Sequence, residues 1–486
     1  MRLSVSYFYY FLNNLGFRLL KFVGLILCAR ILSLHDFGVF STLFSLTSIF
    51  GAVSVFGMHN TVVKYAEETT REGASAFRHL MNLSFGTNLI LSLLFALAVF
   101  ILRDAISHYL GVPVTPLLIG VAATIPMAIG RTMTFVFRAL REPIKSVAID
   151  VSGPACFIAL LGLLAVSRTS SLWMLMVGNF LSLALPLVIG FSLLNRFARA
   201  LPTVVAPTER KRLSTILSFS FFSFIVTLSS LSGGEMDRLF LAWFLDPQTV
   251  GQYNAAARSA FQLNIFYFAF TYAFAPQVVK ENLNGAISIE RDHKRWFLFF
   301  WLTAPFYLAT LGLGRYFLLM FGRDYLAALQ IFLILALGAY VNLLLGPSEV
   351  YLRMLGYQKR EAVYMVLSMV ITIFLDLVLI PKIGMYGAAA GTALGFLAFK
   401  ILATVFAVQQ GLMRIPRITW ARIIYPIPPL LGAATTDNPV TLVALVCLSL
   451  ILMFVIERVP LRELWNTAKE LIINIPGSEA KTGSVG

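Results

Sequence analysis

Long apolar stretches separated by short polar segments are the main feature of the chain. The stretch from Met81 to Leu102 contains no charged residue over 22 positions. At ~1.5 Å of rise per residue, a helix of this length crosses a hydrocarbon core of about 30 Å. Because lipid offers no partner for backbone polar groups, such stretches must be helices. The pattern therefore predicts an all-α membrane protein.

Fourteen stretches are predicted as transmembrane helices. The predicted spans are residues 9–33, 37–58, 80–102, 115–138, 144–166, 171–194, 213–235, 249–275, 296–320, 326–350, 361–381, 386–408, 418–435 and 440–457. Pro426, Pro428 and Pro429 crowd the thirteenth span, and proline disfavours a helix interior. Twelve helices are therefore the alternative count.

The charged segment 195–212 divides the twelve main spans into two sets of six. A weak internal repeat supports this division. Ala29–Phe40 resembles Ala242–Tyr253, and Phe137–Leu140 resembles Leu352–Leu355 at nearly the same offset along the chain. Because six is even, both halves point the same way and are related by an axis along the membrane normal, with the substrate between them.

The predicted organisation follows from this division. It comprises an N-lobe over residues 1–200, a C-lobe over 201–410, two further helices over 411–458 and a cytoplasmic amphipathic tail over 459–486. The two six-helix lobes are predicted to be related by pseudo-two-fold symmetry.

Composition and charge agree with a membrane location. The 486 residues are 58% hydrophobic and 13% charged, whereas soluble domains are about 25% charged. The net charge of +15 would suggest a nucleic-acid partner in a soluble protein. With the N-terminus in the cytoplasm, however, 26 of the 38 lysines and arginines lie on the inner side and 7 on the outer side. This bias predicts cytoplasmic termini and no nucleic-acid partner.

Motifs of common enzyme and metal sites are absent from the sequence. It contains no phosphate-binding Gly-x-x-x-x-Gly-Lys-Ser/Thr loop, no His-Glu-x-x-His, no Cys-x-x-Cys and no Gly-x-Ser-x-Gly. The three cysteines, Cys28, Cys156 and Cys447, all lie in apolar spans. We therefore predict no catalytic site, no metal and no cofactor.

Polar and cationic residues inside spans are the candidate substrate site, because such residues normally face a cavity or a partner. One stripe lies on the first helix, another on the eighth, and one arginine on the fourth. The predicted cationic cavity comprises Asn14, Arg18, Lys21, Arg131, Asn254, Arg258 and Gln262. Arginine forks suit a compact polyanion such as pyrophosphate. The alternatives are that Arg18 and Lys21 extend to the inner interface and that Arg131 pairs with Asp150.

Acidic residues in the spans are fewer. Glu235 and Asp237 lie beside Arg238, which predicts a local ion pair. Asp376 lies in the eleventh span with no cation nearby in sequence, and it is the candidate for a coupling ion or proton site.

Further polar residues are predicted to have structural roles. Glu349 is predicted to pair with Arg353 four residues later, and Lys400 to extend to the inner interface. Ser41, Ser45 and Ser48 form a stripe that suits either sugar hydroxyls or close helix packing, and packing is the interpretation favoured.

Three segments resemble a known family. Arg30–Phe40, Asp237-Arg238 followed by Val250–Ala256, and Ile380–Ala389 are similar to polysaccharide transporters, the Wzx-like flippases of the MOP superfamily. That superfamily also includes the MATE drug exporters and the lipid II flippases. The resemblance covers about 10–410. It implies a MATE-like bundle of two lobes that alternates between inward-open and outward-open states, and a polyprenyl-pyrophosphate-linked oligosaccharide as cargo.

The leading hypothesis is a flippase of the bacterial cytoplasmic (inner) membrane that serves the biosynthesis of a surface polysaccharide, such as O-antigen, capsule or exopolysaccharide. The expected partners are the anionic lipid-linked oligosaccharide, the bilayer, H⁺ or Na⁺, and a polysaccharide polymerase. The first alternative is a MATE-type drug/cation antiporter, but a cationic cargo would favour buried acids, whereas the first lobe holds mainly cations. The second alternative is a membrane glycan polymerase or glycosyltransferase, but such enzymes need a catalytic outer loop, and all outer loops predicted here are short.

Overall fold

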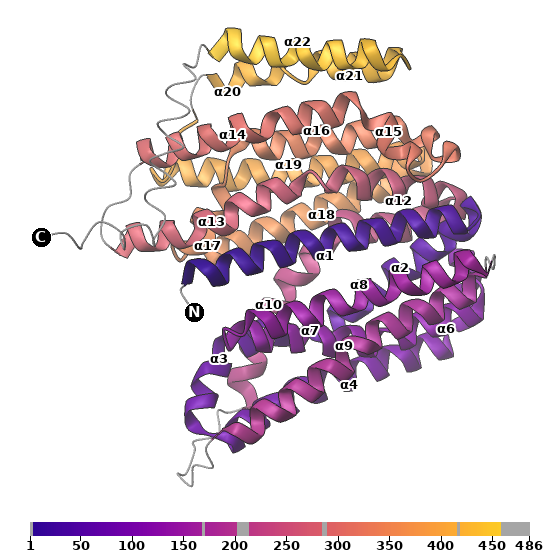
Figure 1. The fold of residues 1–486 in the computed structure, drawn as a ribbon, viewed down its shortest axis with the longest axis vertical. Helices are drawn as coiled ribbons and strands as arrows, with labels where there is room; N and C mark the ends of the chain where they lie inside the picture. Colours follow the sequence, from indigo (N-terminus) through magenta and orange to yellow (C-terminus); the bar gives the residue numbers. More distant parts are fainter. Residues whose placement is uncertain (1–2, 168–170, 202–212, 284–288, 416–417, 458–486) are drawn as a thin grey trace, which may run out of the picture. The chain divides into compact units, whose positions relative to one another are not determined.

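The fold is helical throughout the part of the chain that the structure describes. The computed structural model describes residues 3–167, 171–201, 213–283, 289–415 and 418–457, and these contain helices and no strand (Figure 1). Among them, nine helices are long and apolar enough to cross a membrane, or ten if one bent pair forms a single span. The predicted all-α membrane fold is confirmed, while the count of fourteen stays a prediction. The predicted tail lies outside the described residues.

By their internal contacts the helices form two compact units. The N-terminal unit comprises residues 12–254 and 373–388, and the C-terminal unit comprises 1–11, 255–372 and 389–486. This division differs from the predicted lobes, because residues 213–254 contact α2 and α3 and are therefore grouped with the N-terminal unit. The lobe boundaries at residues 200 and 410 stay predictions.

The N-terminal unit holds most of the first half of the chain. Its elements are α1 (Leu3–Ile31, from Leu12), α2 (Leu34–Val55), α3 (Met58–Glu72), α4 (Ala74–Ile101), α5 (Arg103–Leu110), α6 (Val114–Ala122), α7 (Thr124–Ala139), α8 (Pro143–Val166), α9 (Leu172–Ala200), α10 (Leu213–Leu231), a π-helical turn (Ser232–Met236), α11 (Asp237–Phe244) and the first half of α12 (Pro247–Phe261). Helices α7, α8 and α9 pack side by side (Figure 1). The outer face of α8 is apolar, since Leu163 and Val166 are exposed, as on a surface that faces lipid.

The C-terminal unit holds the remaining helices. They are α13 (Asn264–Leu283), α14 (Ile289–Gly312), α15 (Gly314–Leu319), a 3₁₀ turn (Arg323–Ala328), α16 (Leu329–Leu345), α17 (Ser348–Met354), α18 (Gln358–Ile383, to Thr372), α19 (Met385–Gln409, from Ala389), α20 (Ile418–Ala421), a 3₁₀ turn (Arg422–Ile424), α21 (Ile427–Thr435) and α22 (Pro439–Glu457). Helix α14 packs against α16, α21 and α22. The buried Arg422 guanidinium joins Glu457 on α22 at 2.8 Å. This pair ties the two ends of the α20–α22 segment together.

The internal repeat appears in how α2 and α12 begin. The Ser33 side chain accepts a hydrogen bond from the Asp36 N–H at 3.1 Å, and the Asp246 carboxylate accepts one from the Thr249 N–H at 3.0 Å. These are N-caps at equivalent positions of the first repeated segment. Partial burial raises the pKa of Asp246, but hydrogen bonds from the backbone and hydroxyl of Thr249 and from the backbone of Asp246 and Gln248 together outweigh it and lower the pKa overall.

The second repeat is an elbow between two helices. Arg141 between α7 and α8 has φ +56°, and Gly356 between α17 and α18 has φ +90°. Both are left-handed residues that end a helix, and each directly follows its copy of the second repeated segment. The closing hydrogen bonds run from the Glu142 N–H to the Phe137 carbonyl and from the Tyr357 N–H to the Leu352 carbonyl, both at 2.9 Å. The same elbow therefore occurs once in each unit.

Helices α2 and α12 cross at two glycines. A Cβ on Gly38 would lie 1.6 Å from the Pro247 carbonyl oxygen, and one on Gly251 would lie 3.0 Å from the Leu34 carbonyl oxygen. In the repeat, Leu34 corresponds to Pro247 and Gly38 corresponds to Gly251. The contact of Gly38 with Pro247 is therefore the counterpart of the contact of Gly251 with Leu34. The crossing is therefore locally two-fold symmetric, and its close approach requires glycine.

Candidate functional site

The predicted cations of the N-terminal unit lie on α1 and α7. Arg18 and Arg131 are partly exposed, and Lys21 is exposed. The Lys21 ammonium lies over the Phe17 ring, 4.3 Å from its centroid, which is a cation–π contact. The side chain of Asn14 lies outside the described part of α1. A cavity role for these cations stays a prediction.

The predicted stripe on α12 is interrupted. Asn254 is buried in the N-terminal unit, where its amide donates to the Ser41 hydroxyl at 2.7 Å. Arg258 belongs to the C-terminal unit and is partly exposed. Gln262 lies in the bend that separates α12 from α13, so it does not continue the helical face. Asn254 therefore joins helices, whereas Arg258 stays the candidate of this stripe for an anion.

The predicted pair between Arg131 and Asp150 is wrong. Asp150 on α8 pairs with Arg138 at 2.8 Å and accepts a hydrogen bond from Thr134 at 2.9 Å. These two donors lie one turn apart on α7 and occupy both carboxylate oxygens, which explains why Asp150 pairs with Arg138 instead. Arg131 therefore stays in the candidate cationic set.

A break in the helix pair α10–α11 positions several charged side chains. The helix axes on either side of the π-helical turn differ by 59°, and such turns are frequent at functional sites. Arg238 pairs with Glu235 at 2.6 Å, so the predicted local ion pair is confirmed. Both residues also reach the Ser45 hydroxyl on α2, Glu235 at 2.9 Å and Arg238 at 3.1 Å. Together with Asn254–Ser41, this supports packing as the role of Ser41 and Ser45.

Two buried carboxyl groups meet beside this break. Asp237 on α11 and Asp376 on α18 are both 0% exposed, and their side chains are close enough to share a hydrogen bond. The Tyr253 hydroxyl donates to Asp237 at 2.5 Å. Neither carboxylate oxygen of Asp376 has a donor among the described residues. Adjacent carboxylates repel each other, so this arrangement favours a shared proton or a bound cation.

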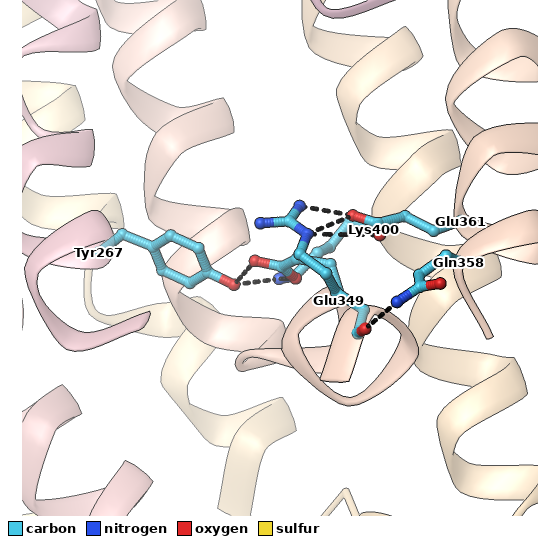
Figure 2. Close-up of polar contacts among 6 residues, drawn as sticks. Tyr267, Glu349, Gln358, Glu361 and Lys400 are labelled. Carbon is cyan, nitrogen blue, oxygen red and sulfur yellow. Dashed lines mark hydrogen bonds and ion pairs between the residues drawn. The ribbon is translucent and has the colours of Figure 1, made fainter. Parts of the chain in front are cut away.

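The C-terminal unit contains a second buried charged cluster (Figure 2). The Lys400 ammonium on α19 donates to Glu349 at 2.7 Å and to the Tyr267 hydroxyl at 2.6 Å, and Tyr267 donates to Glu349. Lys400 and Glu349 are only 3% and 13% exposed. The prediction that Lys400 extends to the interface is therefore wrong, because its charge is neutralised within the protein.

The predicted pair between Glu349 and Arg353 is also wrong. The Arg353 side chain on α17 instead pairs with Glu361 on α18, to which its Nε donates a hydrogen bond at 3.1 Å. Both acids thus take a basic partner from another helix. A buried lysine needs a carboxylate more than a half-exposed arginine does, because an unpaired buried charge is far costlier than an exposed one.

The comparisons with known proteins decide the family. A family model described as polysaccharide biosynthesis protein matches residues 5–280, which is more than half of the chain. The chain belongs to this polysaccharide biosynthesis family. The resemblance found in the sequence is thereby confirmed. No curated protein sequence matches the chain.

Solved structures show the fold of this family member. A lipid II flippase, MurJ, in an inward closed conformation superposes with a TM-score of 0.68 at 14% identity, over 95% of this chain and 99% of that one. An inward-facing multidrug resistance MATE family transporter of the MOP superfamily gives 0.63 at 11% identity, over 81% and 94%. At these identities the likeness shows the fold alone. This family member is a multi-pass membrane protein that shares its fold with these two solved structures.

In this polysaccharide biosynthesis family member, sequence reasoning missed some partners of the candidate residues. The sequence places Tyr253 only within a segment that resembles the family, whereas in the structure its hydroxyl donates to Asp237. Spacing along each helix gives Lys400 and Glu349 separate roles, although they form one pair. The sequence does contain a signal for these partners, because Asp376 and Lys400 both lie in apolar spans without an opposite charge nearby in sequence. Such residues point to partners on other helices.

Proposed function

We propose that this protein translocates a polyprenyl-pyrophosphate-linked oligosaccharide across the bacterial cytoplasmic membrane by alternating access, for the biosynthesis of a surface polysaccharide. The family membership over residues 5–280 carries the proposal. The fold shared with a lipid II flippase supports a lipid-linked cargo. A charged head group cannot cross hydrocarbon unaided, so a carrier must offer it a polar path.

The intramembrane cations support an anionic cargo. Arg18, Lys21 and Arg131 belong to the N-terminal unit and Arg258 to the C-terminal unit. Three of these four cations lie in spans of the first half of the chain, against one acid, Asp150, near the end of a span. This excess of basic over acidic residues in the sequence argues against a cationic drug as cargo. Guanidinium forks bind both oxygens of a phosphate group, which suits the pyrophosphate.

Replacing Arg18 and Arg258 together with glutamine tests the cargo. We expect export of the surface glycan to fall at least about tenfold, because each lost charge-assisted hydrogen bond is worth about 1.5–3 kcal/mol. The measurement is glycan per cell at equal amounts of protein in the membrane. Arg103→Gln is the matched control, since Arg103 pairs with the exposed Asp104. Export at the wild-type level in the double variant would exclude the anion-binding role.

Asp376 and Asp237 are proposed as the coupling site for H⁺ or Na⁺. Support comes from their burial, their contact with each other and the absence of a donor to Asp376 among the described residues. A proton or monovalent cation relieves the repulsion of two adjacent carboxylates, and its binding can thereby be linked to a change of state.

Asp376→Asn tests the coupling site, because asparagine mimics the neutral side chain. In proteoliposomes we expect flipping of the lipid-linked oligosaccharide to lose its dependence on an imposed pH or Na⁺ gradient, while binding of the cargo persists. The exposed Asp104 provides the control Asp104→Asn, which should keep the dependence. Gradient-driven flipping by Asp376→Asn would rule out this site as the coupling site.

A further inference from the structure

A recess lies at one end of the C-terminal unit. It lies between the first turns of α14, the break between α16 and α17, and the segment that follows α19. Trp296, Leu344, Met413 and Arg414 are among its lining residues. The same end holds Arg291, Lys294 and Arg295, so the charge bias of the sequence places it on the inner side of the membrane.

The recess carries a positive charge. Arg414 is exposed, and its guanidinium has no hydrogen-bond or ion-pair partner among the described residues. The other charged residues of the lining are already paired. Asp292 is bound by Arg295 at 2.9 Å, and Arg422 by Glu457 at 2.8 Å. Arg414 is therefore the charge available to a ligand.

The rest of the lining is apolar and aromatic. Trp296, Phe297, Leu344, Leu345 and Met413 line the recess. Nearby in sequence, Trp420 is 64% exposed and Ile423 and Ile424 are also exposed, as in a segment that meets lipid at the interface. A cation beside an apolar wall matches a ligand with a phosphate and a hydrocarbon chain.

We propose that this recess binds an anionic phospholipid of the inner leaflet, with Arg414 at its phosphate and an acyl chain along the apolar wall. Basic pockets between transmembrane helices on the cytoplasmic side suit such head groups. Inorganic phosphate shares the head-group chemistry but cannot use the apolar wall, so the lipid is the better fit. The site is independent of the cargo site proposed above.

Binding of phosphatidylglycerol to the purified full-length protein tests the proposal. Native mass spectrometry in detergent would compare phosphatidylglycerol with phosphatidylcholine for the wild-type protein, Arg414→Gln and Lys294→Gln. Lys294 is the matched control, because it is an exposed cation of α14 outside the recess and pairs with Glu290. We expect the wild type to prefer phosphatidylglycerol, and its affinity to fall about tenfold in Arg414→Gln but not in Lys294→Gln.

Three outcomes would overturn the proposal. If Lys294→Gln lowers the affinity for phosphatidylglycerol as much as Arg414→Gln does, the lipid is attracted by the positive charge of the inner surface in general and not by the recess. Equal binding of phosphatidylcholine would show that the negative charge is not recognised. Displacement of the lipid by an equal concentration of inorganic phosphate would show a plain anion site.

Discussion

Gly38→Ala is expected to separate α2 from α12 and to destabilise the protein by about 1–3 kcal/mol, the usual cost of overpacking a tight contact. The added Cβ would lie 1.6 Å from the Pro247 carbonyl oxygen, whereas ordinary contacts begin near 3.4 Å. Backbone atoms cannot rotate away as the end of a side chain can, so one helix must move. Gly251→Ala meets the Leu34 carbonyl at 3.0 Å and should give a smaller effect of the same kind.

A cross-link across the crossing measures this separation. Ser41 and Asn254 touch at 2.7 Å one turn beyond Gly38. With both replaced by cysteine, in a chain without its three native cysteines, we expect a short bifunctional thiol linker to join α2 and α12. Adding Gly38→Ala should remove most of the cross-linked product. Gly86→Ala is the matched control, since a Cβ there meets nothing within 4 Å. Unchanged cross-linking with Gly38→Ala would contradict the crossing.

The positions of the helices could be predicted because lipid imposes a strong local rule. The apolar run that ends at Leu102 corresponds to α4, and the predicted span 361–381 falls within α18. The repeat was also visible, because caps and elbows depend on local chemistry. Ser33 and Asp246 cap their helices within three residues, and a left-handed residue ends a helix wherever it occurs in the chain.

The candidate site could be predicted only in part. The residues were found because a charge in an apolar span stands out, as with Asp376 and Lys400. Their partners were not found, because spacing within one helix says nothing about a neighbour 51 residues away, which is the separation of Glu349 from Lys400. Proximity in sequence suggested Arg353 for Glu349, but the buried ammonium of Lys400 takes that carboxylate.

Lys400→Met is expected to destabilise the protein strongly, by about 3–5 kcal/mol, because it leaves Glu349 buried without its cation. Glu349→Leu alone should cost a similar amount, since it strands the ammonium. The double variant Glu349→Leu with Lys400→Met removes both charges and should recover much of the loss, because replacing a whole buried pair by apolar residues is often nearly neutral. A thermal unfolding series in detergent measures the coupling between the two positions.

The neighbouring pair supplies the contrast. Arg353, whose side chain is 54% exposed, pairs with Glu361, whose side chain is only 7% exposed. Arg353→Gln should cost less than Lys400→Met, about 1–3 kcal/mol, because the glutamine amide still offers the Glu361 carboxylate a hydrogen-bond donor. The difference in unfolding free energy between Lys400→Met and Arg353→Gln separates the effect of burying the cation from the effect of pairing alone. If Lys400→Met unfolds at the wild-type temperature, the ammonium reaches the lipid head groups in the membrane, as first predicted from the sequence. If the double variant is as unstable as the single variants, the lost stability comes from the change in side-chain volume and not from an unpaired buried charge.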